Sequence, residues 1–232
     1  MYMNTDFSSL SMIQLSDSFF PAGLYTMSNG LETLYHQKMV TNPDGVKELI
    51  QMYYLQQVGP ADCVALANAY DFASQGNLGG VMLVDDIICK VKLVKEQREA
   101  SMRSGRQLIK CVLSFGNNPL ITQYHNEIIK SRTPGRYPAA FAVAVQSLGI
   151  SKQNACLMLF YGFGVSIVGA ALRLGIIQHI ESQKILDSLK PIIIEQVNKY
   201  ISKSYDQIWQ FSPQADIFQM HHEKMEAKMF IT

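Results

Sequence analysis

The chain of 232 residues is 48% hydrophobic and 17% charged, and it carries a formal net charge of +1. This composition excludes a chain that is disordered throughout, and it predicts a large buried interior or large interfaces. A near-neutral protein lacks the basic stripe that nucleic-acid binding requires, so we expect no DNA or RNA partner.

Glycine and proline residues divide the chain into segments with helical periodicity, and no segment shows sustained alternation of apolar and polar residues. The predicted helices are 8–16, 26–38, 44–58, 61–75, 79–95, 96–115, 120–131, 138–148, 152–175, 181–204 (interrupted at Pro191) and 214–228. The sequence therefore predicts an all-α, single-domain helical bundle of about ten helices over residues 1–205. A flexible C-terminal tail is expected over residues 206–232.

Residues 16–32, SDSFFPAGLYTMSNGLE, contain one proline, two glycines and several polar residues. A loop is the simple interpretation, because proline restricts φ and glycine permits positive φ. Asn29 and Gly30 could also form a hairpin turn between two strands. The apolar residues that follow are spaced as on a helical face, which argues against a pair of strands.

The segment 90–110 contains several lysines and arginines, but Glu96 and Glu99 are mixed among them, which favours a solvated helix face. An arginine could also stabilise charge in a partner nucleotidase, and four arginines are candidates for that role: Arg98, Arg103, Arg106 and Arg173. For Arg173 the simpler interpretation is an arginine at a helix end that interacts favourably with the helix dipole or with a carboxylate such as Glu32.

The most apolar segment, residues 155–172, has no charge and is at the lower length limit for crossing a membrane. Residues 138–148 are also apolar and would form the other arm of a hairpin, but this arm is too short to span a bilayer. We therefore expect a buried central hairpin in a soluble protein, with no membrane partner.

The four cysteines are widely spaced and form no metal-binding motif, which predicts reduced thiols: Cys63, Cys89, Cys111 and Cys156. The first ten residues lack the basic and apolar blocks of a signal peptide. Both observations predict a cytoplasmic protein.

The sequence contains none of the common phosphate-binding, zinc-protease or serine-hydrolase motifs, so it gives no sign of an enzyme. The nearest approach to a metal site is residues 220–230, MHHEKMEAKMF, where His222 and Glu226 lie four apart and His221 and Glu223 are adjacent. Such a helix face could bind nickel or zinc. An amphipathic helix that docks on a partner through its methionines and Phe230 is the favoured alternative, because metal sites usually have three or four ligands.

Four blocks of the sequence resemble, in order, blocks of the urease accessory protein family UreF. They are SDSFFPAGLYTMSNGLE after the helix MIQLSDS, REASMRSGRQLIK, YPAAFAVAVQSLGI followed by the apolar helix and AALRLG, and the tail ADIFQMHHEKMEAKMFIT. Together the blocks span residues 10–232.

The resemblance implies an all-α homodimeric scaffold without enzyme activity of its own. Members of this family bridge UreD (also called UreH), which contacts urease, and the GTPase UreG, which carries nickel. The complex delivers Ni²⁺ to the urease apoprotein, so nickel is handled by the complex and no cofactor is held permanently.

The resemblance also implies site residues. The tail over residues 213–232 would be an arm that becomes ordered when it grips UreD, through Met220, His222, Glu223, Met225 and Phe230. A partner-binding or metal-transit surface would include Asp17, Ser18, Ser28, Glu32, Arg173 and Gln183.

The sequence departs from the family pattern in three places. Arg136 stands where the family usually has histidine, and Ala22, Gly23 and Leu24 follow Pro21 in place of the common glycine pair or Gly-Ala. Residues 176–178, Ile-Ile-Gln, replace the usual Pro-Leu-Gly turn, which predicts a longer helix there.

Overall fold

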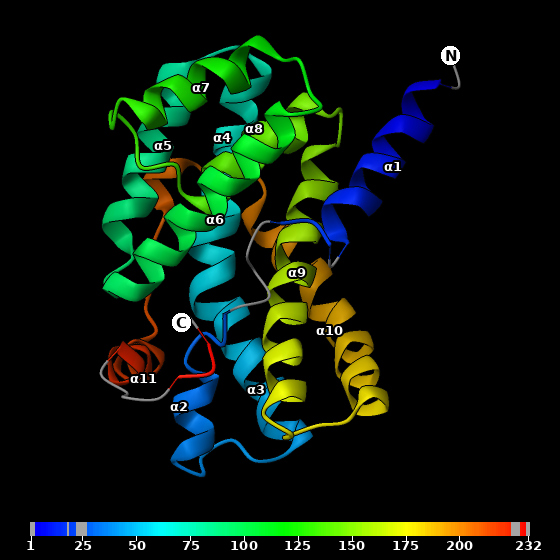
Figure 1. Ribbon diagram of the computed structural model, residues 1–232, viewed down its shortest axis with the longest axis vertical. Coiled ribbons are helices and arrows are strands. Elements are labelled where there is room, and N and C mark those ends of the chain that lie inside the picture. The colour runs from blue at the N-terminus through cyan, green and yellow to red at the C-terminus, as the bar shows by residue number, and fades with distance from the viewer. Residues whose placement is uncertain (1–2, 18, 22–26, 224–227, 231–232) are drawn as a thin grey trace.

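The computed structural model describes residues 3–17, 19–21, 27–223 and 228–230. Its elements, in chain order, are α1 (Met3–Ser16), α2 (Leu31–His36), α3 (Pro43–Tyr53), a π-helix (Tyr54–Cys63), α4 (Val64–Ser74), α5 (Leu78–Val91), α6 (Lys95–Leu113), α7 (Pro119–Ile129), α8 (Tyr137–Ser147), α9 (Lys152–Arg173), α10 (His179–Tyr200), a short 3₁₀ helix (Tyr205–Gln207) and α11 (Pro213–Glu223). No strand occurs in the part of the chain described, and the helices form one body (Figure 1). The all-α prediction is confirmed.

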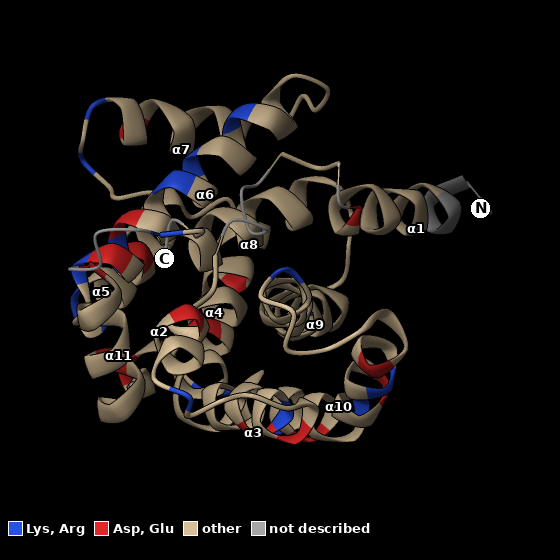
Figure 2. Ribbon diagram, turned by 60° about the horizontal axis from the view of Figure 1, so that its bottom comes forward, with Lys and Arg blue, Asp and Glu red and all other residues tan. Residues whose placement is uncertain are grey.

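The centre of the bundle is the hairpin of α8 and α9. Residues 138–145 of α8 are all buried, and α8 packs against α4, α6 and α9. By length and composition α9 could cross a membrane, but it packs against α3, α4, α8 and α10. Figure 2 shows α9 almost end-on among these helices, without charge along most of its length. The predicted buried hairpin is confirmed.

The predicted helix break at Gly59 and Pro60 is wrong. The chain continues from α3 through the π-helix into α4, with Pro60 inside the helical run. A proline lacks the N–H of the helical hydrogen bond and clashes with the carbonyl four residues earlier, and the wider π turn accommodates both effects. Gly59 permits close packing, because a Cβ at this position would lie 2.6 Å from the Tyr200 ring.

The predicted interruption of α10 at Pro191 is also wrong, since the helix runs unbroken from His179 to Tyr200. Pro191 and Asp187, four residues earlier, both lie on the exposed face of α10. Water can therefore bind the Asp187 carbonyl that loses its helical partner.

The longer helix predicted from residues 176–178 does not form. α9 ends at Arg173, and Gly175 follows with φ +74°, the left-handed conformation that ends many helices. Gln178 then begins α10 with a capping box, in which its backbone N–H donates to Glu181 Oε2 at 2.7 Å.

Arg136, the departure at the start of α8, is buried. Its guanidinium donates to Cys89 Sγ at 2.9 Å and to the backbone carbonyl of Arg98. The backbone N–H of Arg136 donates to Asp85 Oδ1 at 2.8 Å, and Asp85 Oδ2 accepts from the N–H of Gly135 at 2.7 Å. A buried carboxylate on α5 therefore fixes the loop that enters α8. The other departure, at residues 22–24, lies outside the described residues.

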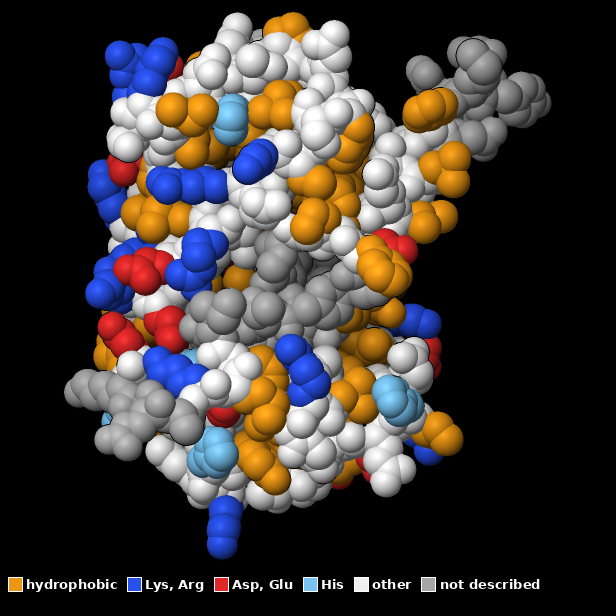
Figure 3. Space-filling model, in the orientation of Figure 1, with side chains coloured by type: hydrophobic (Ala, Val, Ile, Leu, Met, Phe, Trp, Pro, Cys, Tyr) orange, Lys and Arg blue, Asp and Glu red, His pale blue; other side chains and the backbone are white. Residues whose placement is uncertain are grey.

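One helix stands apart from the body. α1 projects from the bundle with apolar side chains on its outer surface (Figure 3), and Phe7, Leu10 and Ile13 are 75%, 63% and 65% exposed. These three residues recur every third position, so they lie on one side of α1. This exposed apolar side of α1 is a candidate for one of the large interfaces that the composition predicts.

Candidate functional site

The candidate site lies where the C-terminal helix α11 meets the start of α2. α2 is preceded by a left-handed turn, in which Asn29 has φ +52° and Gly30 has φ +82°. α11 passes directly over this turn, since a Cβ on Gly30 would lie 3.2 Å from Gln219 Cγ. The positive φ and the close approach of α11 both favour glycine at position 30. The turn places Glu32, in the first turn of α2, in contact with α11.

His222 of α11 is fully buried between two carboxylates. Its Nε2 lies 2.8 Å from Glu32 Oε2, and its Nδ1 lies 2.9 Å from Glu96 Oε2 on α6. A carboxylate only accepts hydrogen bonds, so both ring nitrogens must donate and the ring is an imidazolium. The three side chains form an interaction that we call the tail clasp: Glu32, Glu96 and His222.

The charges of the clasp raise the pKa of His222. Burial by itself lowers the pKa, because it disfavours the charged ring, but the hydrogen bonds and charges of Glu96 and Glu32 outweigh it. Lys228 adds a second positive charge, with Nζ at 3.5 Å from Glu96 Oε1. The two carboxylates thus face two cations, one buried (His222) and one at the surface (Lys228).

The end of the tail also binds Glu32. The backbone N–H groups of Met229 and Phe230 donate to Glu32 at 2.7 Å and 3.3 Å. Phe230 is buried, and the guanidinium carbon of Arg173 lies 4.4 Å from the centre of its ring. Glu32 therefore binds the tail at two points, before and after residues 224–227.

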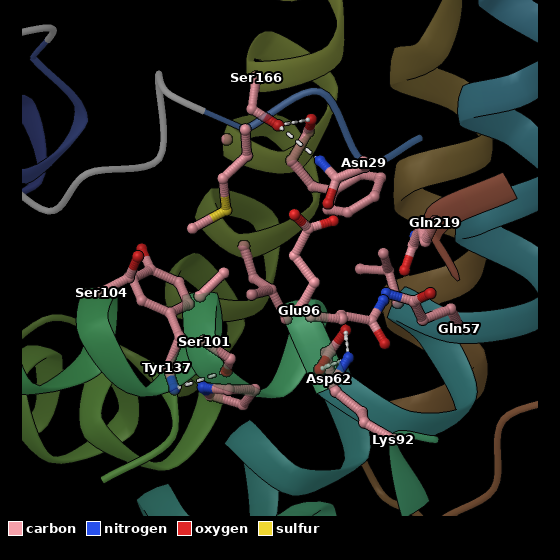
Figure 4. Close-up of a pocket in the computed structure, with 18 of the residues that line it drawn as sticks. Asn29, Gln57, Asp62, Lys92, Glu96, Ser101, Ser104, Tyr137, Ser166 and Gln219 are labelled. Carbon is pink, nitrogen blue, oxygen red and sulfur yellow. Dashed lines mark hydrogen bonds and ion pairs between the residues drawn. The ribbon is translucent and has the colours of Figure 1, made fainter. Parts of the chain in front are cut away.

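Next to the clasp is a cavity of about 90 Å³ between α6, α8, α9, α11 and the π-helix (Figure 4). Its polar lining includes Gln57 and Asp62 from the π-helix, Glu96 and Gln97 from α6, and Gln219 from α11. Most of the remaining lining is apolar or carries hydroxyl groups. Gln219 makes α11 one wall of the cavity.

A buried ion pair borders the cavity. Lys92 Nζ lies 2.8 Å from Asp62 Oδ1 and 3.0 Å from Asp62 Oδ2, and both side chains are almost fully buried. Gln57 and Asp62 both line the cavity from the π-helix. A π turn contains more residues than an α turn, so it changes which side chains of the helix point to the same side. Insertions of this kind are frequent at functional sites.

The structure brings together several residues that the sequence singled out separately. Glu32, Arg173, His222 and Phe230 meet at the clasp and its neighbouring ring contact, and Ser28 is buried in the turn before α2. His221, Met220 and Glu223 are exposed on the outer side of α11. Among the other predicted residues that the structure describes, Asp17 and Gln183 do not join the clasp.

Asp17 lies at the end of α1, where it lines a second cavity of about 70 Å³. This second cavity shares Tyr137 of α8 and Met158, Gly162 and Ser166 of α9 with the first one. Gln183 is exposed on α10. Ser18, Met225 and Glu226 lie outside the described residues.

The metal-binding alternative depended on His222 and Glu226 sharing a helix face. Both ring nitrogens of His222 are occupied by carboxylates on opposite sides, so neither is free for a metal in this arrangement. Among the residues that the structure describes, no group of three or more His, Cys, Asp or Glu side chains is placed to hold a metal ion.

Sequence reasoning missed Glu96, Gln97 and the other amides of the cavity. It treated residues 90–110 as a solvated face, whereas one side of α6 is buried: Gln97, Ala100, Ser104, Gly105 and Leu108. These residues recur at intervals of three and four and most are small or uncharged, which was the available signal of a packed side.

Comparisons with known proteins agree with the resemblance in the sequence. A model of the UreF family matches residues 40–190. The urease accessory protein UreF of Trichodesmium erythraeum is 32% identical, over 98% of this chain and 99% of its own length. The UreF proteins of Actinobacillus pleuropneumoniae serotype 3 and Haemophilus influenzae strain Rd are 25% and 26% identical, over 96% of this chain and 98% and 94% of their own lengths.

Proposed function

The chain belongs to the UreF family of urease accessory proteins, and we propose that it acts as an adaptor in urease maturation. In this proposal it bridges UreD (UreH) and the GTPase UreG, supports GTP-dependent insertion of nickel into the urease active site, and has no enzyme activity of its own. Nickel is the cargo of the complex. The protein is a homodimer in its working state.

The position of α11 supports the adaptor proposal. The inner side of this helix is fixed to the body by His222 and Gln219, and the outer side is left exposed, with Ile217 and Met220 at 52% and 43%. A helix held this way presents an ordered apolar strip to a partner without first losing conformational entropy.

The predicted tail residues that the structure describes therefore divide into two groups. His222 and Phe230 position the tail against the body, while Met220 and Glu223 face outward and contact UreD. The sequence predicted an arm that becomes ordered on binding. The contacts of the described tail residues support an arm that is already docked on the body and that UreD contacts on its outer side.

A co-purification experiment tests this assignment. Met220→Asp places a charge on the exposed strip of α11, and we expect it to weaken association with UreD by at least about tenfold, because a buried unpaired charge is costly. The protein should be co-expressed with UreD and UreG and analysed by size-exclusion chromatography with light scattering.

Ile194→Asp is the matched control, because Ile194 is 55% exposed on α10, away from the tail. It should leave the complex intact. Equal retention of UreD by both variants would show that α11 is not the contact surface. A wild-type protein that binds neither UreD nor UreG would refute the adaptor function.

A further inference from the structure

The cavity beside the clasp is lined by buried glutamine side chains, each of which has at least one amide atom without a hydrogen-bond partner. Gln57, Gln97 and Gln219 are 2%, 9% and 3% exposed and come from three different elements. Within the described part of the chain, no partner is found for Gln57 Oε1, Gln219 Oε1 or either polar atom of the Gln97 amide. Figure 4 shows Gln57 and Gln219 at the same side of the cavity.

Such groups are uncommon in folded proteins. A buried polar atom that loses water without gaining a partner costs about 1–3 kcal/mol, so native interiors rarely leave several of them together. Their convergence on one cavity indicates that the cavity holds something with which they can form hydrogen bonds.

The orientation of Gln219 is fixed by its neighbours. The Tyr53 hydroxyl donates to the Asn29 carbonyl at 2.5 Å, and the same hydroxyl oxygen accepts from Gln219 Nε2 at 3.0 Å. Burial raises the pKa of Tyr53, so the phenol stays protonated and keeps this direction. Gln219 Oε1 is therefore an acceptor, and it lacks a donor.

The charged groups around the cavity are already paired. Lys92 is bonded to Asp62, and Glu96 is bonded to His222 and Lys228. A charged ligand would lose its hydration here and meet no free countercharge among these groups. The cavity therefore favours a neutral ligand over a charged one.

The apolar lining and the volume of the cavity limit the shape and size of the ligand. Apolar side chains cover much of the cavity wall, among them Val58, Ala100, Leu159 and Phe163. A volume of about 90 Å³ has room for roughly six water-sized groups. A few convergent polar groups in a mainly apolar cavity are typical of small-molecule sites.

We propose that this cavity binds a small neutral molecule whose polar head both donates and accepts hydrogen bonds, as a primary carboxamide does, and whose short apolar tail lies against the apolar wall. The head would meet the amides of Gln57, Gln97 and Gln219. Because Gln219 belongs to α11, the bound molecule would also strengthen docking of the tail. The site does not depend on the adaptor function.

Three probes of equal shape test the proposal: propanamide, propanoate and propanamidinium, which are neutral, negative and positive. Met27 lines this cavity alone and Met158 lines both cavities, so the ¹³C-methyl NMR signal of Met27 reports binding locally, with the exposed Met39 as an internal control. We expect propanamide to shift the Met27 signal saturably at millimolar concentration, and the two charged probes to bind at least tenfold more weakly.

A matched pair of variants locates the binding. Gln97→Met removes the two unpaired atoms and should raise the thermal unfolding midpoint while weakening propanamide binding at least tenfold. Gln107→Met makes the same change on the exposed side of α6 and should alter neither quantity. Gly162→Leu offers a second test, because a side chain there enters open space beside the cavity.

Absence of a saturable shift would mean that the cavity holds water alone, and would overturn the proposal. Binding of propanoate as strong as that of propanamide would overturn the neutral head group. Unchanged propanamide affinity in both Gln97→Met and Gly162→Leu would place the molecule elsewhere and refute this site.

Discussion

His222 decides how the tail is attached. A cation with no exposed surface is stable in a protein only when paired, and this one meets a carboxylate at each ring nitrogen. Its removal leaves Glu32 and Glu96 buried beside each other with less compensation. A single residue near the end of the chain therefore couples α11 to α2 and α6.

The first prediction concerns pH. The folded state raises the pKa of His222, so the protonated ring is bound more tightly in the folded than in the unfolded chain. The stabilisation is fully present below the ordinary imidazole pKa of about 6.5 and is lost as the pH rises through the raised folded pKa. We expect His222→Gln to lower the free energy of unfolding by about 3 kcal/mol at acidic pH, and by less as the pH increases.

Urea unfolding of wild type and variant across a pH series measures this difference. The exposed His36, changed to Gln, serves as the control for the loss of a histidine. A wild-type advantage that grows with rising pH would contradict an imidazolium clasp.

At the scale of elements, α6 and the loop into α8 approach each other too closely for a side chain. A Cβ on Gly105 would lie 2.3 Å from the Gly135 carbonyl oxygen and 2.8 Å from the Arg136 carbonyl carbon. Both atoms belong to the backbone, so the helix and the loop would have to separate. This contact also sets the position of Gln97 and Glu96, two turns earlier on α6.

The second prediction uses two helical glycines. Gly105→Ala should destabilise the protein by about 1–3 kcal/mol through overpacking. Gly169→Ala in α9 introduces a Cβ that meets nothing within 4 Å, and the better helix propensity of alanine should stabilise the protein by up to about 1 kcal/mol. Chemical denaturation of both variants gives the comparison, and effects of the same sign would refute the packing argument.

At the scale of the whole molecule, the fold depends on α9 being a core helix. Phe160 has no exposed surface, its ring packs edge-on against Tyr54 at 5.1 Å between centres, and the Tyr54 hydroxyl donates to its carbonyl at 2.7 Å. Tyr161, the next residue, is 42% exposed. Adjacent residues of one helix thus face the interior and the surface.

The third prediction follows from this difference. Phe160→Ala should lower the free energy of unfolding by about 3–5 kcal/mol, because it leaves a cavity in the core. Tyr161→Ala should change it by about 0.5 kcal/mol or less. Both proteins should purify without detergent, and a requirement for detergent, or equal costs for the two substitutions, would argue that α9 is not the core of a water-soluble bundle.

The helical periods, the punctuation by glycine and proline, and the apolar hairpin of α8 and α9 are local features, so the sequence alone determined the all-α fold and its central pair. Four ordered blocks also pointed to the UreF family, and they contained Glu32, Arg173, His222 and Phe230 as separate candidates. The continuous π-helix through Pro60 and the unbroken α10 were beyond this reasoning, because surrounding packing and solvent offset the local cost of proline.

Only the tertiary structure decided that Glu32 and His222, which are 190 residues apart, form one hydrogen bond, and that Glu96 completes the clasp. It also decided that Gln57, Gln97 and Gln219 line one cavity. Periodicity tells which side of a helix is buried, but the partner of a buried polar group depends on how distant helices cross. That crossing is fixed by packing of the whole core, and no short stretch of sequence records it.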